Sequence, residues 1–388
     1  MQKIGWIQSL DLEGWQGKNI LRFLHLNAPT PAPMLEHLRL VAQGHMVPRV
    51  SLPPDISQRV MPSLRPLELK NINISSGFPP LPHLRCLKFT SIQSPAIRPS
   101  ALLSLIQYSP ELETIEVEGV DEEDLSDCPR TRVQLWNLLN LSITSQKIAA
   151  SALLGHLDFP RSADVTFISE WRHTGNPDLS NLVEICANRF AAHGAHSIDK
   201  VQFHGGERFR LSGWCGRHRC LYISFSLERQ NIPTGLLTLC LAPRLETVST
   251  LELDRLVEMP QTQWAELFGA FKQVEALRFA GFRIIHPLRA LTKVPGNPPL
   301  LARLKALQIS DCFICQRFNH RASLESKVFT RLTKLLKERK HLEIPVKVSF
   351  EFCSVTAAAI GRLEEFSEIA WDNSDIYMSD AYETEEED

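Results

Sequence analysis

Two groups of cysteine and histidine residues carry side chains that bind zinc in proteins. Cys312 and Cys315 have the spacing of a zinc knuckle, and Cys215, His218 and Cys220 form a second group. A structural zinc site needs four ligands, and the pairs of a compact site are usually joined by one short loop. Cys220 and Cys312 lie 312 − 220 = 92 positions apart, and Cys312 also occupies a turn of a repeat. We therefore expect no metal site.

Three histidines are the other candidates for chemistry. His193 and His196 lie about one helical turn apart, and His204 follows them. Histidines at a helix end more often face solvent or the helix carbonyls than bind a metal. The sequence has no Walker-type phosphate loop, no His-Glu-x-x-His and no Gly-x-Ser-x-Gly motif. We expect a protein that is not an enzyme and has no cofactor; a metal-dependent enzyme built on His193, His196 and the cysteines is the less favoured alternative.

Charge is nearly balanced over the whole chain but not along it. The 388 residues include 42 Lys and Arg and 44 Asp and Glu, and the net charge of −2 argues against a nucleic-acid partner. Residues 372–388 hold eight acidic side chains and no Lys or Arg, so the remainder carries −2 + 8 = +6. We interpret 372–388 as an acidic disordered tail, with a basic partner or phosphorylation of Thr384 as alternatives.

The N-terminus and the cysteines indicate the compartment. Residues 1–6 lack a basic region followed by an apolar run, and no stretch approaches the ~20 apolar residues of a membrane span. The nine cysteines are an odd number scattered through the chain, unlike a disulfide framework. We expect a cytoplasmic or nuclear protein without a membrane partner.

A repeat of apolar residues must position all of these groups. An apolar residue, here called position 1, is followed by apolar residues at positions 4 and 6. The first six copies are separated by 28, 29, 20, 28 and 26 residues, and a period of roughly 20–29 residues is typical of leucine-rich repeats. Position 1 is occupied by Ile7, Leu35, Leu64, Leu84, Leu112, Leu138, Ile198, Val248, Val274 and Leu304, with a weak copy at Val165-Ile168.

This spacing predicts an α/β fold, a leucine-rich-repeat solenoid with a curved parallel sheet, helical and irregular returns, and irregular repeats. Positions 4 and 6 point to one face of a short strand, and such strands stack in parallel. Proline donates no ladder hydrogen bond, so we expect Pro66 to distort its strand or weaken its pairing. Position 9 should turn inward and be buried; it is occupied by Ile72, Ile92, Val120, Leu256, Phe282 and Cys312.

Helical returns are predicted at 100–108, 149–157, 178–192, 262–270 and 323–339, with Ser100 and Thr262 as N-caps. A strand at 344–350, a helix capped by Ser354 and a strand at 369–371 should cover the end of the solenoid. Alternating runs separated by Gly205-Gly206 and by Gly213 predict hairpin-like insertion strands. We predict four segments: N-terminal repeats at 1–164, irregular repeats with the insertion at 165–247, C-terminal repeats and cap at 248–371, and the tail at 372–388.

The chain resembles the leucine-rich-repeat portion of the large F-box protein group of mushroom-type fungi. The resemblance lies in Ala32–Leu38, Pro62–Leu67, Arg98–Leu103 with Pro110–Glu113, and Leu335–Arg339 through Cys353 to Ile369–Asp372. It implies the substrate-recognition part of a cullin–RING ubiquitin ligase subunit, whose F-box docks a Skp-type adaptor. The repeats begin at Ile7, so we expect no F-box ahead of them. Leu52–Ile56 has an F-box-like opening, but we interpret it as a loop between repeats.

The concave side of the predicted sheet is the candidate binding surface, because solenoids use this surface to bind proteins. The charges there are mixed, with acidic residues in the middle and basic residues early, which favours a protein partner over a phosphate backbone. We expect a non-catalytic protein-interaction scaffold, with a truncated or degenerate family member that recruits no ligase as the alternative. The candidate residues are Arg39, Glu68, Lys88, Glu116, Glu118, Ser142, Glu252, Asp254, Arg278 and Gln308.

Overall fold

The chain forms two compact units in a computed structural model. Unit 1 comprises Met1–His196 and His218–Glu228, and unit 2 comprises Ser197–Arg217 and Arg229–Asp388. Among the helices of the described residues, none has both the length and the apolar character that crossing a bilayer requires. The structure describes residues 6–15, 19–20, 22, 32–42, 50–52, 61–74, 80–90, 98–120, 132–145, 151–173, 179–190, 197–205, 208–227, 245–255, 259–281, 284–292, 298–312, 314 and 322–372.

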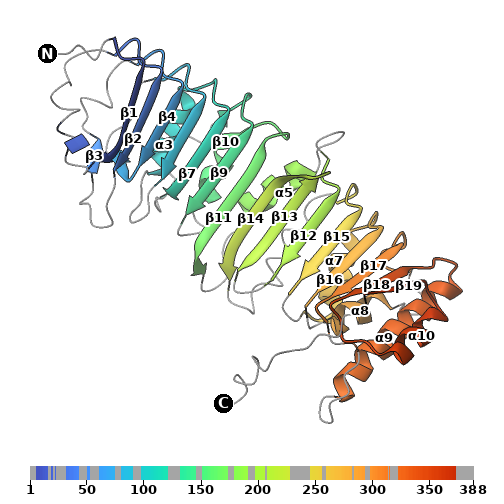
Figure 1. Ribbon diagram of the computed structural model, residues 1–388. Helices are drawn as coiled ribbons and strands as arrows, with labels where there is room; N and C mark the ends of the chain where they lie inside the picture. The colour runs from blue at the N-terminus through green and yellow to red at the C-terminus, as the bar shows by residue number, and fades with distance from the viewer. Residues whose placement is uncertain are drawn as a thin grey trace. The chain divides into compact units, whose positions relative to one another are not determined.

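Unit 1 contains parallel strands in the order β1-β2-β4-β6-β7-β9-β11-β14 (Figure 1). These strands are β1 (Ser9–Trp15), β2 (His37–Ala42), β4 (Pro66–Lys70), β6 (Cys86–Thr90), β7 (Thr114–Val120), β9 (Asn140–Ser145), β11 (Asp164–His173) and β14 (His218–Leu227). Two small pairs join β3 (Val50–Leu52) to β5 (Ile72–Ile74) and β8 (Val133–Gln134) to β10 (Leu157–Asp158). The returns include α3 (Pro99–Gln107), α4 (Ser151–Gly155) and α5 (Ser180–Phe190).

The predicted leucines of unit 1 lie in direct register. Leu38 pairs with Leu67, Leu67 with Leu87, and Leu87 with Ile115. Each of these four side chains is at most 2% exposed. Fully burying one such side chain contributes about 1.5–3 kcal/mol. Stacked burial of position 4, and of position 6 beside it, therefore holds the strands together and confirms the predicted repeat.

Unit 2 repeats this arrangement. Strand β12 (Lys200–His204) pairs in parallel with β15 (Thr250–Asp254), and β16 (Ala276–Ala280), β17 (Ala306–Ser310), β18 (Lys347–Glu351) and β19 (Ile369–Trp371) follow in order. On its other side β12 pairs antiparallel with β13 (Phe209–Cys215), as expected for the predicted hairpin-like strands. The helices are α7 (Gln261–Ala270), α8 (Ile285–Leu291), α9 (Ala322–His341) and α10 (Ala357–Glu364).

A turn precedes the strands, and the repeat pattern of the sequence did not include it. The N–H of position 1 donates to the carbonyl three residues earlier, for example Leu64 to Met61 at 3.2 Å and Leu84 to Leu81 at 3.1 Å. In four repeats the residue directly after the one that supplies this carbonyl is proline, which is favoured at the second position of such a turn. The residue that supplies the carbonyl is buried; it is Ala32, Met61, Leu81, Ser109, Leu135, Leu245 or Leu301.

A second turn follows the strands at position 8 and adopts a left-handed backbone. Its N–H donates to the position 7 carbonyl of the next strand, as from Asn71 to Thr90 at 2.7 Å and from Arg255 to Ala280 at 2.8 Å. This bond follows β4, β12, β15, β16 and β17, and it ties each of these strands to the one after it. The left-handed residues, with their φ angles, are Gly14 (80°), Asn71 (57°), Gly119 (76°), Arg255 (48°), Gly281 (99°), Asp311 (53°) and Phe352 (51°).

The inward residue at position 9 behaves as predicted wherever it is described. Ile72, Val120 and Cys312 are each at most 4% exposed, whereas Ile92, Leu256 and Phe282 lie outside the described residues. The Cys312 thiol also donates to the Gly281 carbonyl at 2.6 Å. Cys353, one repeat later, donates to the Ile309 carbonyl at 3.2 Å. Sulfur therefore supplies a hydrogen bond at two of these turns in addition to packing.

One expectation about the strands is confirmed in part and another is wrong. Pro66 does not distort its strand, because it is the first residue of β4 and its register with Cys86 is regular. It does weaken the pairing with β2 by one hydrogen bond, because Arg65 alone donates to the Glu36 carbonyl, whereas in other repeats the position 3 N–H donates as well. The weak copy is displaced by three residues: Val165 pairs with Leu141 at position 4 and Phe167 with Ile143 at position 6, so Ile168 does not point inward.

The helix caps also differ from prediction. α3 begins at Pro99 after the N-cap Arg98, and α7 follows Pro260, because proline suits the start of a helix without a side-chain bond. At α10 the N-cap is Thr356, not Ser354, since the Thr356 hydroxyl accepts from the Ala359 N–H. Gly213 lies inside β13, and the break before β14 falls at Gly216-Arg217, where Gly216 has φ +62°.

Candidate functional site

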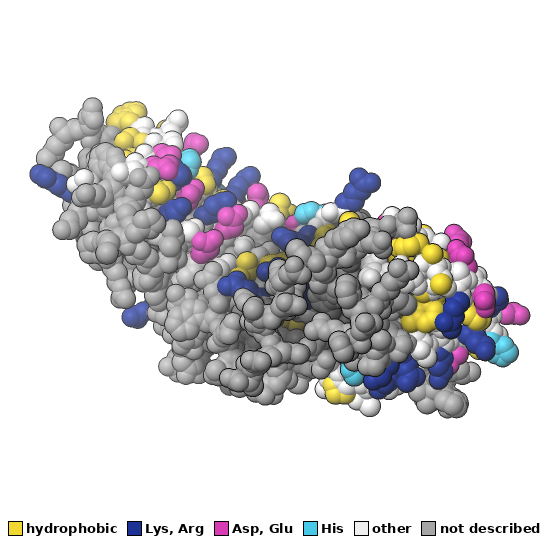
Figure 2. Space-filling view, turned by 60° about the horizontal axis from the view of Figure 1, so that its bottom comes forward, with side chains coloured by type: hydrophobic (Ala, Val, Ile, Leu, Met, Phe, Trp, Pro, Cys, Tyr) yellow, Lys and Arg dark blue, Asp and Glu magenta, His cyan; other side chains and the backbone are white. Residues whose placement is uncertain are grey.

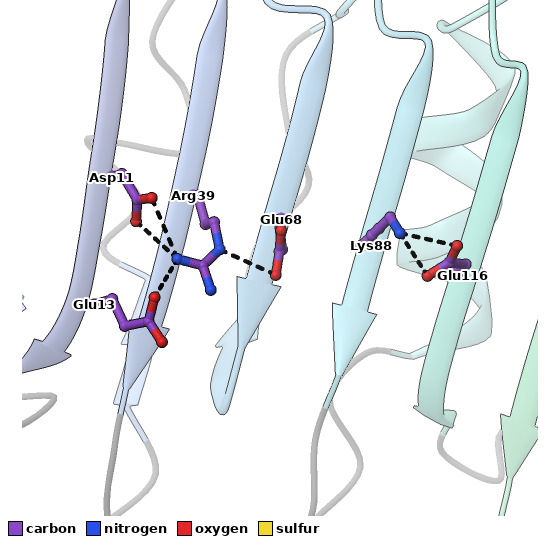
Figure 3. Close-up of polar contacts among 6 residues, drawn as sticks. All are labelled: Asp11, Glu13, Arg39, Glu68, Lys88 and Glu116. Atoms are coloured by element: carbon purple, nitrogen blue, oxygen red, sulfur yellow. Dashed lines mark hydrogen bonds and ion pairs between the residues drawn. The ribbon is translucent and has the colours of Figure 1, made fainter.

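All ten predicted surface residues stand at positions 5 or 7 of a strand and point away from the buried leucines. In unit 1 the position 5 side chains pair in register from Asp11 through Arg39, Glu68, Lys88 and Glu116 to Ser142. Figure 3 shows the charged members on one face of the strands, with helix α3 behind them. We call these six residues, with Glu13, Lys70 and Glu118 at position 7, the open face of unit 1.

Arg39 lies at the centre of a cluster of carboxylates on this face. Its Nη1 contacts Asp11 at 3.1 Å and Glu13 at 2.5 Å, and its Nε lies 3.3 Å from Glu68 (Figure 3). The hydrogen bond that Arg39 donates to Glu13 is the largest cause that raises the pKa of Arg39 above its ordinary value, followed among the favourable contacts by Asp11 and Glu68. Arg39 is therefore fixed by strands on both sides of its own.

Lys88 and Glu116 form the next pair along the row. The Lys88 Nζ donates to Glu116 Oε1 at 2.9 Å and lies 2.8 Å from Oε2. The Glu116 hydrogen bond raises the pKa of Lys88. The row therefore alternates in sign over five strands, and opposite charges on adjacent strands stabilise their pairing.

The early part of the open face is balanced in charge and not basic, because Asp11, Glu13 and Glu68 contribute −3 and Arg39, Lys70 and Lys88 contribute +3. Glu116 and Glu118 then bring the whole open face to −5 + 3 = −2. Figure 2 shows Lys or Arg and Asp or Glu side chains interspersed toward the N-terminal end, without a large patch of one sign. Asp11 and Glu13 were missing from the predicted set, although they follow from the same rule applied to the repeat of Ile7.

The corresponding face of unit 2 contains a second set of pairs. Glu252 and Arg278 lie in register with Gln308 at position 5. Glu252 contacts Lys200 at 2.8 Å, and the Lys200 ammonium also lies 5.0 Å from the centre of the Trp214 ring. Asp254 contacts His204 Nδ1 at 2.6 Å, and Arg278 lies 3.9 Å from Glu351. Lys200 and Trp214 were not among the predicted surface residues, because the prediction followed the position 5 row and both lie outside it.

Most of the candidate histidines and cysteines that the structure describes either contact a carboxylate or are buried in the fold. His204 binds Asp254, and the His218 Nε2 lies 2.6 Å from Asp164. Burial is the largest cause that raises the pKa of the Cys312 thiol, and it raises that of Cys353 to about 11, so both favour the neutral form. Within the described ranges no three His, Cys, Asp or Glu side chains are grouped so that they could hold a metal ion. Cys315, His193 and His196 lie outside those ranges.

The register of the strands and the repeated turns define the class of this protein: an α/β leucine-rich-repeat solenoid. No model of a known protein family matches the chain, and no curated protein matches it in sequence. Among solved structures, the chain is similar to a leucine-rich-repeat protein of Leptospira interrogans, with 13% identity and a TM-score of 0.34 over 94% of this chain and 90% of that one.

Proposed function

We propose that this protein is a non-catalytic interaction scaffold that binds a protein partner on the open face of unit 1. The observation that carries the proposal is the row of charged side chains from Asp11 to Glu116, held in register by ion pairs between neighbouring strands. Ion pairs hold Arg39 and Lys88 in place before binding. A partner then pays less conformational entropy when it docks.

The charge of the open face favours a basic segment of the partner. The residual −2 comes from carboxylates that outnumber the cations, and Glu118 at position 7 is exposed. Lys or Arg side chains of a partner can therefore approach Glu118 and the outer oxygens around Arg39. Complementary charge mainly sets specificity and the rate of association.

Within this proposal the partner is a substrate for ubiquitination. Support comes from the sequence resemblance to the repeat portion of fungal F-box proteins, carried by Ala32–Leu38, Pro62–Leu67 and Arg98–Leu103. The alternative is a family copy that binds its partner without recruiting a ligase. The two differ in one observable, which is association with a Skp-type adaptor.

The binding face is tested by reversing charge on it. We expect Glu116→Lys/Glu118→Lys to lose proteins that the unmodified chain retains in affinity purification read by mass spectrometry. The matched control is Glu364→Lys/Glu365→Lys, which makes the same charge change on α10, and circular dichroism checks that both variants fold. Equal retention by both variants would show that the open face does not bind.

The ligase role has its own test. Purified chain is mixed with a Skp-type adaptor and analysed by size-exclusion chromatography. Co-elution supports ligase recruitment. Separate elution, together with charge-dependent retention of a partner, would contradict the ligase role and leave the binding scaffold.

A further inference from the structure

Helix α9 of unit 2 packs one face against the fold and presents the other to solvent. Its buried Arg339 donates from Nη1 to the Leu301 carbonyl at 3.0 Å and from Nη2 to the Leu300 carbonyl at 2.5 Å. These bonds and the apolar packing fix which side of the helix faces outward. The apolar side chains, each at most 6% exposed, are Val328, Leu332, Leu335 and Leu336.

The outward side of α9 is basic. Between Lys327 and His341 it carries five cations that are exposed or half-buried and one carboxylate, that of Glu338, which gives +5 − 1 = +4. Figure 2 shows several Lys and Arg side chains close together at the end of the molecule where α9 and α10 lie. We call these five cations the basic face of α9; they are Lys327, Arg331, Lys334, Lys337 and Lys340.

The contacts of the basic face neutralise little of its charge. The Lys334 Nζ lies 3.8 Å from Glu338 Oε1. The Lys340 Nζ donates to the Glu365 backbone carbonyl at 2.6 Å and lies 6.0 Å from the centre of the Phe366 ring, and neither contact brings a negative charge. Among the residues that the structure describes, no carboxylate forms an ion pair with the other three cations, which are Lys327, Arg331 and Lys337.

The spacing of these cations makes them repel one another. Lys327 and Arg331 are four residues apart, and each of the following cations comes three residues after the one before it. Residues three and four apart are neighbours on a helix surface, and like charges there are destabilising. An acidic segment lying along the basic face would relieve this repulsion over the whole row.

Negative charge is concentrated in the sequence that follows β19. Residues 373–388 include seven Asp and Glu and no Lys or Arg, and they begin directly after Asp372, which is bonded to the Phe352 N–H. Helix α10 contacts both α9 and β19, and the Glu365 carbonyl that Lys340 binds lies four residues before β19. An extended chain of this length spans up to roughly 50 Å, whereas Lys327 and Lys340 are about 20 Å apart along the helix. The acidic segment can therefore reach the whole basic face.

We propose that the acidic segment 373–388 of this chain docks on the basic face of α9. Charge complementarity supplies the attraction, and attachment to the same unit gives the segment a high effective concentration at the helix. The docked segment excludes other acidic partners from α9. The open face of unit 1 has no part in this contact, so the inference stands apart from the proposed binding of a protein partner there.

The test is carbodiimide cross-linking of the full chain, which joins a carboxylate to a lysine amine in contact with it. An equal mixture of unlabelled and nitrogen-15-labelled chains is cross-linked at low salt, digested and read by mass spectrometry. We expect bonds from 373–388 to the four lysines of the basic face, at least about five-fold more abundant than bonds to the exposed Lys272 elsewhere in unit 2. Bonds between a light and a heavy chain would place the segment on a second copy. That result, or equal yields at all exposed lysines, would overturn the proposal.

Variants separate the basic face from the overall charge of the chain. Lys327→Glu/Lys337→Glu should lower the yield of bonds from 373–388 to Lys334 and Lys340 about five-fold, whereas Lys327→Arg/Lys337→Arg, which keeps the charge, should leave it unchanged. Arg210→Glu/Lys272→Glu makes the same charge change at two exposed residues of unit 2 outside α9 and should also have no effect. Equal yields in the Glu and Arg variants of α9 would contradict the proposal.

Salt gives a second test that needs no substitution. Raising sodium chloride from about 50 to about 500 mM screens exposed charges, so the bonds from 373–388 to the basic face of the unmodified chain should become several-fold rarer. Circular dichroism checks that each variant folds, and the salt test decides the question if the charge-reversed variant does not. Yields that do not change with salt would overturn a docking held by charge.

Discussion

The carboxylate of Asp372 accepts the backbone N–H of Phe352 at 2.9 Å. Elsewhere in unit 2 the position 8 N–H donates to a backbone carbonyl of the next strand, as from Gly281 to Ser310 at 3.1 Å and from Asp311 to Glu351 at 3.2 Å. Phe352 is the position 8 residue of the last full repeat. A side chain therefore replaces the carbonyl that a further repeat would supply.

Replacing Asp372 with alanine should destabilise unit 2. The Phe352 N–H would lose its acceptor, at a cost of about 1 kcal/mol. Urea unfolding measures the change, with Asp372→Asn as the control because its amide oxygen can still accept. If alanine and asparagine had the same effect, the loss would not come from this hydrogen bond.

Glycine at position 352 should stabilise the protein. Phe352 is 59% exposed and has φ +51°, so its side chain gives up little packing while the left-handed backbone costs roughly 1 kcal/mol. The converse change, Gly281→Ala, should be destabilising, because a Cβ there would lie 3.1 Å from the Arg255 Cγ at φ +99°. Thermal unfolding should move the melting temperature in opposite directions for the two variants, and a shift of equal sign would contradict this account of the turn.

Stability should fall in alkaline solution through Cys353. The pKa of this thiol is raised to about 11, and burial is the largest cause of the increase. In the unfolded chain the thiol titrates near pH 8.5. The folded state then holds a proton that the unfolded state releases, so the contribution is complete below about pH 8.5 and is lost as the pH rises toward 11. Urea midpoints from pH 7 to 10.5 should decline less steeply in Cys353→Ala, and parallel curves would exclude this thiol as a cause.

Added salt should change the melting temperatures of Arg39→Met and of the unmodified protein in opposite directions. Removing Arg39 leaves Asp11, Glu13 and Glu68 without the cation that contacts all three. Added sodium chloride screens the remaining repulsion and should stabilise the variant, while it weakens the ion pairs of the original protein. Melting temperatures at low and high salt measure this, and stabilisation of both proteins to the same extent would argue against the cluster.

The Lys88–Glu116 pair should contribute little to stability. Its side chains are 38% and 46% exposed, and exposed pairs contribute roughly 0.2–1 kcal/mol. A double-mutant cycle with Lys88→Met and Glu116→Gln should therefore give a coupling below about 1 kcal/mol. A much larger coupling would mean that the pair is structural, and Glu116→Lys would then be unsuitable for testing binding.

Burial was predictable from the sequence because it is periodic. Leucines such as Leu67 and Leu87 recur with the repeat, so positions 4 and 6 could be identified in nearly every strand. The weak copy failed because Ile168 is apolar and directly follows Phe167, so the apolar pattern did not distinguish the two faces of that strand. The predicted caps failed where proline at the start of a helix replaced a capping side chain.

Hydrogen bonds between repeats could not be predicted. Arg255 and Phe352 have no preference for a left-handed backbone, and they adopt it because the turn binds the following strand or Asp372. The candidate face was predicted residue by residue, but the pairing of Arg39 with three carboxylates depends on the register of strands about 28 residues apart.

The position 8 bonds run in one direction, from a strand to its successor. Each repeat that is added at the C-terminal end therefore supplies the carbonyl acceptor for the position 8 N–H of the repeat before it. Evolution or a protein engineer could lengthen unit 2 by inserting a complete repeat ahead of Lys347, with Asp372 still serving as the terminator. An insertion after Asp372 would need a new acceptor of its own.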